Sequence, residues 1–385
     1  MKKNIAVIFG GRSVEHDISI LTGLHAIKHI ENYRIYPIYL TRENQIVTGN
    51  GLFDIDYYIK GKASGKRVSF SNGLMYVKNK EVKVEAVLNC CHGGIGESGD
   101  LAKVLEVAGV PITSCNYNSA KVLQSKFRTR EILSQNGFVQ PKYMILEKNE
   151  FYLEMVEWKM KEVGFDFPVI VKPDTLGSSI GINIVKNQEE LSDALTVGFE
   201  LDDKVIIEEF LKDITEINCS AVMLNGDVKV SSIEEINNKS DFLDFETKYL
   251  DSSSGFISKG KATATVIHEK RAEGIKCIKR VKTKENPNDV LYSKIKELTK
   301  KAYQIFDCSG VVRADFMVAN DEIYLNEINT VPGFLAYHLW ARRSVPYGVL
   351  IDDLVKQAVS DHKNKPRFKT VFKSDILEKN RVLLS

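Results

Sequence analysis

The chain lacks a long apolar run and a strong charge bias. Its 385 residues carry 53 Lys and Arg against 51 Asp and Glu, a formal net charge of +2. That balance argues against a strongly charged tail that binds a partner of opposite sign. No stretch approaches the roughly 18 consecutive apolar residues of a transmembrane helix, and no signal-peptide cleavage site follows the first apolar residues. We therefore expect a cytoplasmic protein without membrane or nucleic-acid partners.

Motifs that define several common classes are also missing. The six cysteines include no Cys-x-x-Cys pair, so the sequence indicates neither a zinc site nor a disulfide framework. No GxxxxGK[ST] occurs, which excludes a P-loop. With 43% hydrophobic and 27% charged residues, the composition is that of a globular protein long enough for two or three domains.

Residues 1–115 have the pattern of an α/β domain with a parallel sheet. An apolar strand begins at Asn4 and ends at Gly10-Gly11, a helix is expected to start at Ser13, and further strands are predicted over 35–39, 67–77 and 84–89. A second glycine-rich turn begins at His92. Because ligands bind at the carboxyl ends of such strands, Glu15 and His92 are candidate contacts. The alternatives are a helix-dipole partner for Glu15 and a structural role for His92.

The rest of the chain has an α+β pattern, with a central subdomain predicted over 116–209 and a C-terminal subdomain over 210–365. A basic insertion is expected at about 255–286, and a tail follows over 366–385. The segment 259–286 holds nine Lys or Arg and three Glu, so the overall charge balance is an average over unlike parts. The predicted elements are one helix over 118–136, strands over 143–146, 167–172, 182–186, 205–208 and 216–224, helices over 291–306 and 348–359, and a hairpin over 311–329.

The predicted hairpin carries the most informative polar residues. Glu327 and Asn329 are two apart and therefore face the same side of their strand. A three-residue turn at 319–321 would bring Arg313 and Asp315 to that face, whereas a two-residue turn would put Asp315 on the opposite side. Two carboxylates, an amide oxygen and a guanidinium suit Mg²⁺ and the phosphate oxygens that it bridges. The competing interpretation is a solvated hairpin face with an Arg-Glu pair.

A second candidate site lies where the predicted strand ends at Lys172. The loop that follows contains Gly177-Ser178-Ser179-Ile180-Gly181. Its backbone N–H groups and hydroxyls, beside an ammonium, have the chemistry of a phosphate cradle. An ordinary glycine-serine turn next to a solvated lysine is the alternative.

Taken in order, these segments resemble the D-alanine:D-alanine ligase family of the ATP-grasp superfamily. The resemblance runs from residue 5 to about 359 through FGGRSVEHDIS, CHGGIGESGD, VIVKPDTLGSSIGI, IIEEFL, ETKYLD, VRADF and LNEINTVPGF. It implies an ATP-grasp fold with an N-terminal Rossmann-like parallel-sheet domain, and ATP between the second and third domains. It also implies ADP-forming ligation of two D-alanines to D-alanyl-D-alanine, through an acyl phosphate, for peptidoglycan precursors. A homodimer is expected from the same resemblance.

The resemblance further implies a role for each site residue. ATP is expected to contact Lys126, Lys172, Ser178, Ser179, Glu208, Leu211, Glu216, Lys248 and Asn326. Two Mg²⁺ ions, with Mn²⁺ as a substitute, are expected at Asp315, Glu327 and Asn329. The first amino acid is expected to contact Glu15 and His92, with Ser178 and Tyr249 completing that network, and the oxyanion is expected at Arg313 and the Gly333 N–H.

Three departures from the family pattern are present, and the first two bear on the second substrate. His338 stands where the family has a serine that binds the carboxylate of the second amino acid. The chain after Tyr249 is also about 25 residues longer than the family's loop, and the family's Gly-Glu-Asp-Gly is Gly96-Glu97-Ser98-Gly99. Two alternatives therefore stay open. One is a ligase of the same mechanism that joins D-alanine to another amino or hydroxy acid, and the other is a catalytically silent nucleotide-binding homologue.

Overall fold

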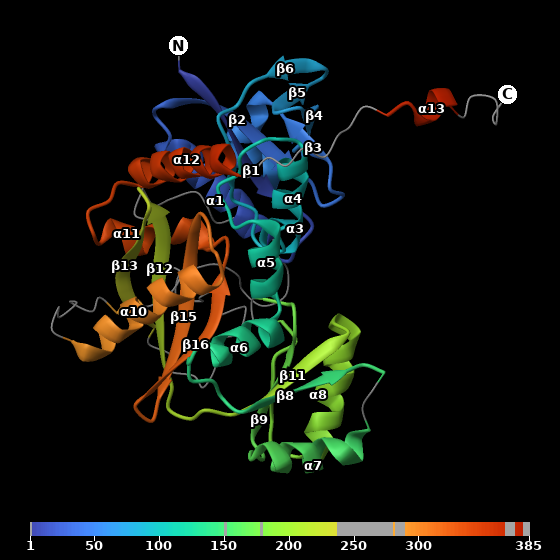
Figure 1. Ribbon diagram of the computed structural model, residues 1–385, viewed down its shortest axis with the longest axis vertical. Coiled ribbons are helices and arrows are strands. Elements are labelled where there is room, and N and C mark those ends of the chain that lie inside the picture. Colours follow the sequence, from blue (N-terminus) through green and yellow to red (C-terminus); the bar gives the residue numbers. More distant parts are fainter. Residues whose placement is uncertain are drawn as a thin grey trace.

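The computed structural model describes residues 2–149, 152–177, 180–236, 280–281, 289–365 and 374–379. Three sheets of seven, four and five strands follow one another along the chain. In Figure 1 the first sheet lies at the top, the five-stranded sheet below it and the four-stranded sheet at the bottom. No helix within the described ranges is long and apolar enough to cross a membrane.

The first sheet is parallel only in part. Its strand order is β6-β5-β4-β3-β2-β1-β7. The pairs β2-β1 and β1-β7 are parallel, as predicted. The neighbouring strands from β2 to β6 all pair antiparallel. Short connections join strands in an antiparallel arrangement, so β3 to β6 extend the sheet as a meander that the sequence prediction missed in part. The bounds are β1 Lys3–Gly10, β2 Tyr33–Leu40, β3 Ile46–Thr48, β4 Lys66–Ser71, β5 Leu74–Val77, β6 Lys80–Val82 and β7 Val87–Asn89.

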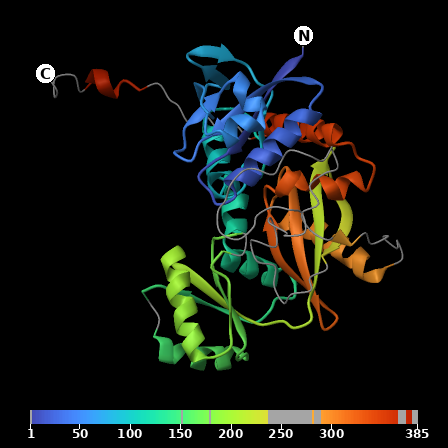
Figure 2. The same cartoon turned by 180° about the vertical axis from the view of Figure 1, so that it is seen from behind.

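The first sheet and the five-stranded sheet share one hydrophobic core. Helix α12 (Tyr347–Asn364) comes from the end of the described fold, yet it lies against the first sheet, as Figure 2 also shows. Its buried Leu350 and Leu354 belong to a cluster with Phe9 of β1 and Val311 of the five-stranded sheet. Because interiors pack densely, this shared core fixes the two sheets relative to each other. The other helices of the first unit are α1 His16–His29, η1 Asn50–Phe53, α2 Ile55–Ile59, α3 Gly94–Glu97 and α4 Asp100–Val107.

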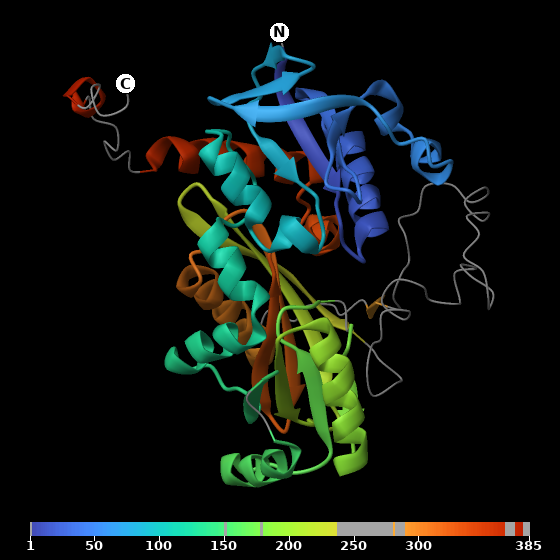
Figure 3. The same cartoon turned by 90° about the vertical axis from the view of Figure 1, so that its right-hand side faces the viewer.

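The four-stranded sheet has a core of its own. Its order is β10-β9-β11-β8, with every neighbouring pair antiparallel. Helices α7 and α8 contribute Met160 and Leu195 to a cluster that is separate from the shared core, and Figure 3 shows this unit at the far end from the first sheet. The bounds are β8 Tyr143–Glu147, α7 Leu153–Val163, β9 Val169–Pro173, β10 Asn183–Val185, α8 Gln188–Leu201 and β11 Lys204–Glu209.

Two helices, and not the single helix predicted over 118–136, connect the first sheet to the four-stranded one. Helix α5 (Tyr117–Gln124) ends at Ser125, whose φ of −85° and ψ of 115° are extended, and α6 (Lys126–Gln135) begins directly after it. The Ser125 hydroxyl accepts a hydrogen bond from the Arg128 N–H at 3.2 Å, which caps α6. It also donates to Asp174 at 2.7 Å. The break therefore fastens the start of α6 to the end of β9.

The five-stranded sheet is antiparallel, in the order β14-β13-β12-β15-β16. Helix α10 covers one face, where Ile295 and Tyr303 pack with Ile217 and Phe316. The other face carries polar side chains, among them Asn218 and Asp315. The bounds are β12 Thr215–Leu224, β13 Asp227–Ile236, β14 Arg280–Val281, α10 Val290–Ile305, β15 Val311–Ala319, β16 Glu322–Asn329, η3 Gly333–Ala336, α11 Tyr337–Ala341 and α13 Ile376–Lys379.

Candidate active site

The β15-β16 hairpin closes with a two-residue turn, one of the two turns that the sequence left open. Ala319 pairs with Glu322. Between them Asn320 and Asp321 have φ values of 51° and 64°, which is the left-handed conformation that a type I′ turn requires at both central positions. Asparagine and aspartate adopt it more readily than most other residues do. The pair Asn320-Asp321 therefore favours a two-residue turn, and this pair is visible in the sequence.

A β-bulge reverses the consequence expected of that turn. Phe316 pairs with Leu325, whereas the next residue back, Asp315, pairs with Glu327. Asn326 is thus the extra residue on β16, and such an insertion shifts the alternation of side chains by one. Asp315 and Glu327 consequently lie opposite each other on one face. Arg313 pairs with Asn329 on the same face.

Asp315 is the centre of a polar cluster on this face. Arg313 donates from Nε and Nη2 to its two carboxylate oxygens, each at 2.6 Å, and Asn329 Nδ2 donates to Oδ2 at 2.9 Å. Within the described ranges, no three His, Cys, Asp or Glu side chains gather as a metal cluster. Mg²⁺, however, is usually held by one or two carboxylates together with substrate phosphates. The side-chain oxygen atoms of Asp315, Glu327 and Asn329 are suitable ligands for such an ion.

The four-stranded sheet supplies cations to the other side of the site. Lys172, only 5% exposed at the end of β9, donates from Nζ to Glu208 Oε2 at 2.7 Å. The other oxygen of Glu208 accepts from Arg130 Nε at 2.9 Å. Burial opposes the ionisation of Glu208, but the charges of Arg130 and Lys172 outweigh it and lower its pKa to about 2. Glu208 is therefore ionised and engaged by two cations, and Arg130 is a member of this cluster that the sequence did not reveal.

Lys126 lies where the two antiparallel sheets meet. Its ammonium donates to the carbonyl oxygens of Pro173 and Asp174 at 3.2 and 3.3 Å. Burial lowers its pKa, Glu327 across the gap raises it and Lys172 lowers it. Since charges act in this way only at short range, the lysines of one unit and the carboxylates of the other border one site.

The first sheet contributes a third wall. His92 is 2% exposed, its Nε2 lies 2.7 Å from Thr22 Oγ1, and its Nδ1 lies 2.7 Å from the carbonyl oxygen of Val331. Burial lowers its pKa, and the Glu15 carboxylate raises it. A Cβ on Gly93 would lie 3.1 Å from Glu15 Oε2, and the φ of Gly93 is +63°. The glycine turn therefore allows Glu15 to approach closely.

Glu97 joins this wall, although the sequence prediction gave it no role. Burial raises its pKa well above the ordinary value, the Glu15 and Glu327 carboxylates raise it further, and Arg313 and a backbone hydrogen bond lower it. These influences come from both the first sheet and the β15-β16 hairpin. Glu97 thus marks the junction between them, and its position in the glycine-rich turn was the one available signal.

The segment after β16 closes the site with an unusual backbone. Phe334, Leu335 and Ala336 have φ values of 51°, 51° and 52°, which non-glycine residues rarely adopt in succession. The Phe334 N–H donates to Thr22 Oγ1 at 3.2 Å, so the helix that contacts His92 also holds this turn. Gly333, the predicted oxyanion donor, begins it.

The remaining predicted residues fall into three groups. Leu211 and Glu216 are partly buried, one in the connection after β11 and the other on β12, and Asn326 is the bulge residue of β16. His338 Nε2 lies 3.1 Å from Glu234 Oε2, a contact that the sequence did not predict. Four further predicted residues lie outside the described ranges: Ser178, Ser179, Lys248 and Tyr249.

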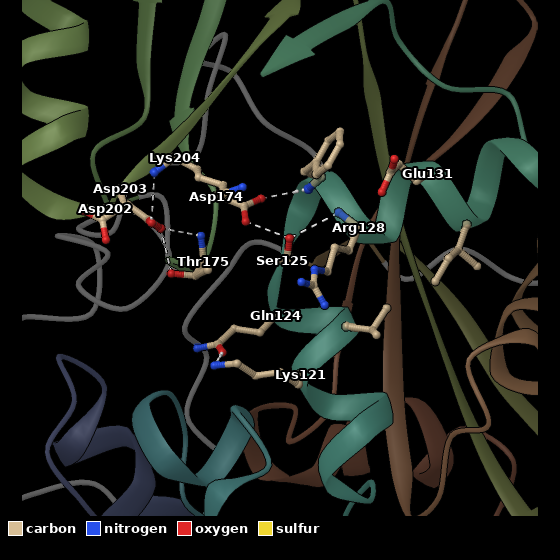
Figure 4. Close-up of a pocket in the computed structure, with 13 residues that line it drawn as sticks. Lys121, Gln124, Ser125, Arg128, Glu131, Asp174, Thr175, Asp202, Asp203 and Lys204 are labelled. Carbon is tan, nitrogen blue, oxygen red and sulfur yellow. Dashed lines mark hydrogen bonds between the residues drawn. The ribbon is translucent and has the colours of Figure 1, made fainter. Parts of the chain in front are cut away.

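A separate hollow of about 690 Å³ lies behind the α5-α6 break (Figure 4). Lys121, Arg128 and Lys204 line it together with four carboxylates. Two of these are engaged locally, since Asp174 accepts from Ser125 and Asp202 accepts from the Thr175 N–H at 2.7 Å. None of the predicted site residues lines the hollow, so it is distinct from the site between the sheets.

The two antiparallel sheets, with Lys172 on one and Asp315 and Glu327 on the other, define an ATP-grasp fold. The D-alanine–D-alanine ligase from Coxiella burnetii superposes on the chain with a TM-score of 0.77 at 22% identity, covering 100% of this chain and 99% of that one. The VanG D-Ala:D-Ser ligase from Enterococcus faecalis does so with a TM-score of 0.75 at 24% identity, covering 93% and 100%. At these identities the similarity establishes the fold.

The chain belongs to the D-alanine–D-alanine ligase family. Residues 4–115 match the family described as D-ala D-ala ligase N-terminus, and residues 132–285 and 268–360 match D-ala D-ala ligase C-terminus. The D-alanine–D-alanine ligase of Thermosipho melanesiensis is 33% identical over 374 residues, which cover 94% of this chain and 95% of that protein. The protein is accordingly a ligase, and its family implies ATP as the nucleotide.

Proposed function

We propose that the protein joins two D-alanines to D-alanyl-D-alanine, with ATP cleaved to ADP and phosphate, for peptidoglycan precursors. The observation that carries the proposal is the meeting of three walls at one site. Lys126 and Lys172 come from the four-stranded sheet side, Asp315 and Glu327 from the five-stranded sheet, and Glu15 from the first sheet. The lysines that would bind phosphates therefore face the carboxylates that would bind a metal ion. The Glu15 side of the site, which would bind the first amino acid, lies beside them.

The first step transfers a phosphoryl group to the first D-alanine. One carboxylate oxygen forms a bond to the γ-phosphorus, the bond to the bridging oxygen breaks, and ADP leaves. Lys126 and Lys172 would offset the charge on the phosphate oxygens, which is the main contribution that a protein makes to such a transfer. Magnesium at Asp315, Glu327 and Asn329 would add further positive charge there. The adenine and ribose contacts are assigned to Glu208, Leu211, Glu216 and Asn326, and the remaining phosphate contacts to Ser178, Ser179 and Lys248.

In the second step the amine of the second D-alanine attacks the acyl phosphate. A carbon-nitrogen bond forms, the carbon-oxygen bond to phosphate breaks, the amine loses its proton and inorganic phosphate leaves. Arg313 and the Gly333 N–H would stabilise the oxyanion of the tetrahedral intermediate. Glu15 and His92 would orient the first amino acid, with Ser178 and Tyr249 beside them.

Phosphate release and product mass test this function. Purified protein with ATP, Mg²⁺ and D-alanine should release phosphate and form a species with the mass of the dipeptide, whereas L-alanine should support neither. Asp315→Asn should lower the rate by about 100-fold or more, because removing a preorganised charge typically has that effect. Asp227→Asn is the matched control, since Asp227 pairs with Lys229 and Lys300 on the exposed surface. Normal activity of Asp315→Asn would remove Asp315 from the site, and an inactive wild type would favour a silent homologue.

A ligase with another second substrate is the competing function, and His338 is the observation that favours it. An imidazole is bulkier than the serine hydroxyl of the family pattern, and it presents ring nitrogens in place of a hydroxyl oxygen. A panel of D-amino acids and D-hydroxy acids, each offered with D-alanine and scored by product mass, separates the two. D-alanyl-D-alanine as the main product supports the proposal. A mixed dipeptide or depsipeptide as the main product contradicts it.

Assembly and location complete the proposal. A homodimer and a cytoplasmic location rest on the family resemblance and on the sequence composition, and the site described above lies within one chain. Light scattering of the purified protein measures the mass directly. A mass of about two chains supports the dimer, and a mass of one chain contradicts it.

A further inference from the structure

Glu234 shares a cross-strand row with the predicted metal ligands. It pairs with Asn218, Asn218 pairs with Asp315, and Asp315 pairs with Glu327. Directly opposed residues lie on the same face of a sheet, so Glu234 faces the site. At about 4.8 Å per strand, its position is roughly 10 Å from that of Asp315.

The neighbouring residue confirms this orientation. Glu235 faces the other side, where its carboxylate accepts a hydrogen bond from Tyr292 of α10 at 2.6 Å. Consecutive residues on a strand alternate between faces. Glu234, at 1% exposure, is therefore a carboxylate buried on the face that bears the site. It does not face the core that α10 covers.

Two side chains from α11 and its end hold Glu234. His338 Nε2 lies 3.1 Å from Oε2, and Arg342 Nη2 lies 3.6 Å from Oε1. The two residues are four apart, a spacing that places them on one side of a helical turn. Arg342 also donates from Nη1 to the Ile233 carbonyl oxygen at 2.9 Å. The same side chain therefore binds the backbone of β13, the strand that carries Glu234.

The cluster lies at the end of the cross-strand row that contains Asp315, and the family resemblance assigns its residue 338 to the second amino acid. His338 is five residues after Gly333 in sequence, stands where the family pattern has the carboxylate-binding serine, and keeps 21% of its side chain exposed. A carboxylate accepts hydrogen bonds and cannot donate them. Because Nε2 faces Glu234, a hydrogen bond from this ring to a substrate carboxylate has to come from Nδ1. Both ring nitrogens then carry protons, and Glu234 supplies the counter-charge.

We propose that Glu234 is a positioning residue for the second substrate: it orients His338 so that the imidazole Nδ1–H binds the carboxylate of the acceptor amino acid. Arg342 forms an ion pair with the other oxygen of Glu234, 3.6 Å away, and so adds positive charge beside that carboxylate. This inference rests on the proposed ligase function and deepens it. It assigns a residue outside the predicted set to the selection of acceptors that carry a carboxylate.

The test compares two acceptors that differ in that carboxylate. Hydroxylamine attacks acyl phosphates through nitrogen and has no carboxylate, so it reports on the first step alone. Glu234→Gln should lower kcat/KM for dipeptide formation by about 10- to 100-fold, the effect of losing a charged hydrogen bond. The rate of D-alanine hydroxamate formation at saturating hydroxylamine should stay within about twofold of the wild type.

A second background separates positioning from a merely structural role. In His338→Ser, the Glu234 carboxylate has no imidazole to hold and repels the acceptor carboxylate. Adding Glu234→Gln should then raise kcat/KM for dipeptide formation, the opposite of its effect beside His338. Glu235→Gln, the same change one residue along the strand, should leave the ratio of dipeptide to hydroxamate rates unchanged.

Each outcome decides the inference. Equal losses with both acceptors would show a structural defect and overturn it, as would an unchanged dipeptide rate or a further loss in the double variant. In these cases wild-type turnover still upholds the ligase function. A wild type that makes neither dipeptide nor hydroxamate would refute the function, and the inference with it.

Discussion

Asp315 lies directly opposite Glu327 in the β15-β16 ladder, and a single extra residue makes this possible. With the two-residue turn alone, Asp315 would pair with Asn326, and Glu327 would turn to the helix-covered face. The bulge at Asn326 brings Glu327 to the polar face, and bulges often re-aim a side chain next to a site in this way. The predicted metal site thus depends on a residue that bears no charge.

Deletion of Asn326 should therefore abolish phosphate release while most of the fold is retained. Without the bulge, Glu327 turns to the opposite face, since a one-residue shift reverses side-chain alternation. We expect turnover to fall by about 100-fold or more, with circular dichroism close to that of the wild type. Asn320→Gly, in the turn of the same hairpin, should keep full activity because glycine adopts positive φ readily. A deletion variant with normal turnover would show that the bulge does not position the site.

Arg130→Met should strongly destabilise the protein. Arg130 and Glu208 are each 1% exposed, and removal of one partner leaves a buried charge only partly compensated, at a cost of about 3–5 kcal/mol. Urea unfolding measures the loss. Arg128→Ala, at an exposed position on the same helix, should change stability by about 0.5 kcal/mol or less. Similar values for the two variants would contradict the account of the cluster.

The same cluster predicts a pH dependence. The pKa of Glu208 is held at about 2, below its ordinary value of 4.5. A depressed folded-state pKa stabilises the protein above about pH 4.5, and this contribution is lost as the pH falls towards 2. The free energy of unfolding of the wild type should decline over that interval more steeply than that of Glu208→Gln. Parallel curves for the two proteins would contradict the predicted contribution.

Gly310→Ala should cost more stability than Gly137→Ala, although both glycines have positive φ. A Cβ on Gly310 would lie 2.0 Å from the Thr113 carbonyl oxygen. A Cβ on Gly137 would have no heavy atom of another residue within 4 Å beyond its chain neighbours. The φ values are similar, 69° and 74°, so the comparison isolates the steric clash. We expect a difference of about 1–3 kcal/mol in urea unfolding. Equal losses would mean that the chain around Thr113 yields without cost.

Local patterns in the sequence were sufficient to predict most of the strands and helices. The apolar run of β1, the glycine turns and the spacing of Glu327 and Asn329 depend on neighbours in sequence, and the structure places them as expected. The break at Ser125 was also encoded locally, as a capping serine, but the helical pattern on both sides masked it.

Features that arise from pairing between distant segments could not be predicted. The Asn326 bulge is defined by the pairing with β15, and in β16 itself only the two successive polar residues Asn326 and Glu327 interrupt the alternation. Arg130 is buried against a strand nearly 80 residues away, although arginine on a helix is usually exposed. Glu234 acquires its partners from α11, about 100 residues later. In each case the identity of the residue was visible, and its environment was not.

The most direct test of the account follows one oxygen atom. If the first D-alanine is activated as an acyl phosphate at this site, D-alanine labelled with ¹⁸O in its carboxylate should pass one labelled oxygen to each phosphate released with the dipeptide. Mass spectrometry of the phosphate measures the transfer. One ¹⁸O per phosphate is the predicted result, and dipeptide formation with unlabelled phosphate would contradict the mechanism.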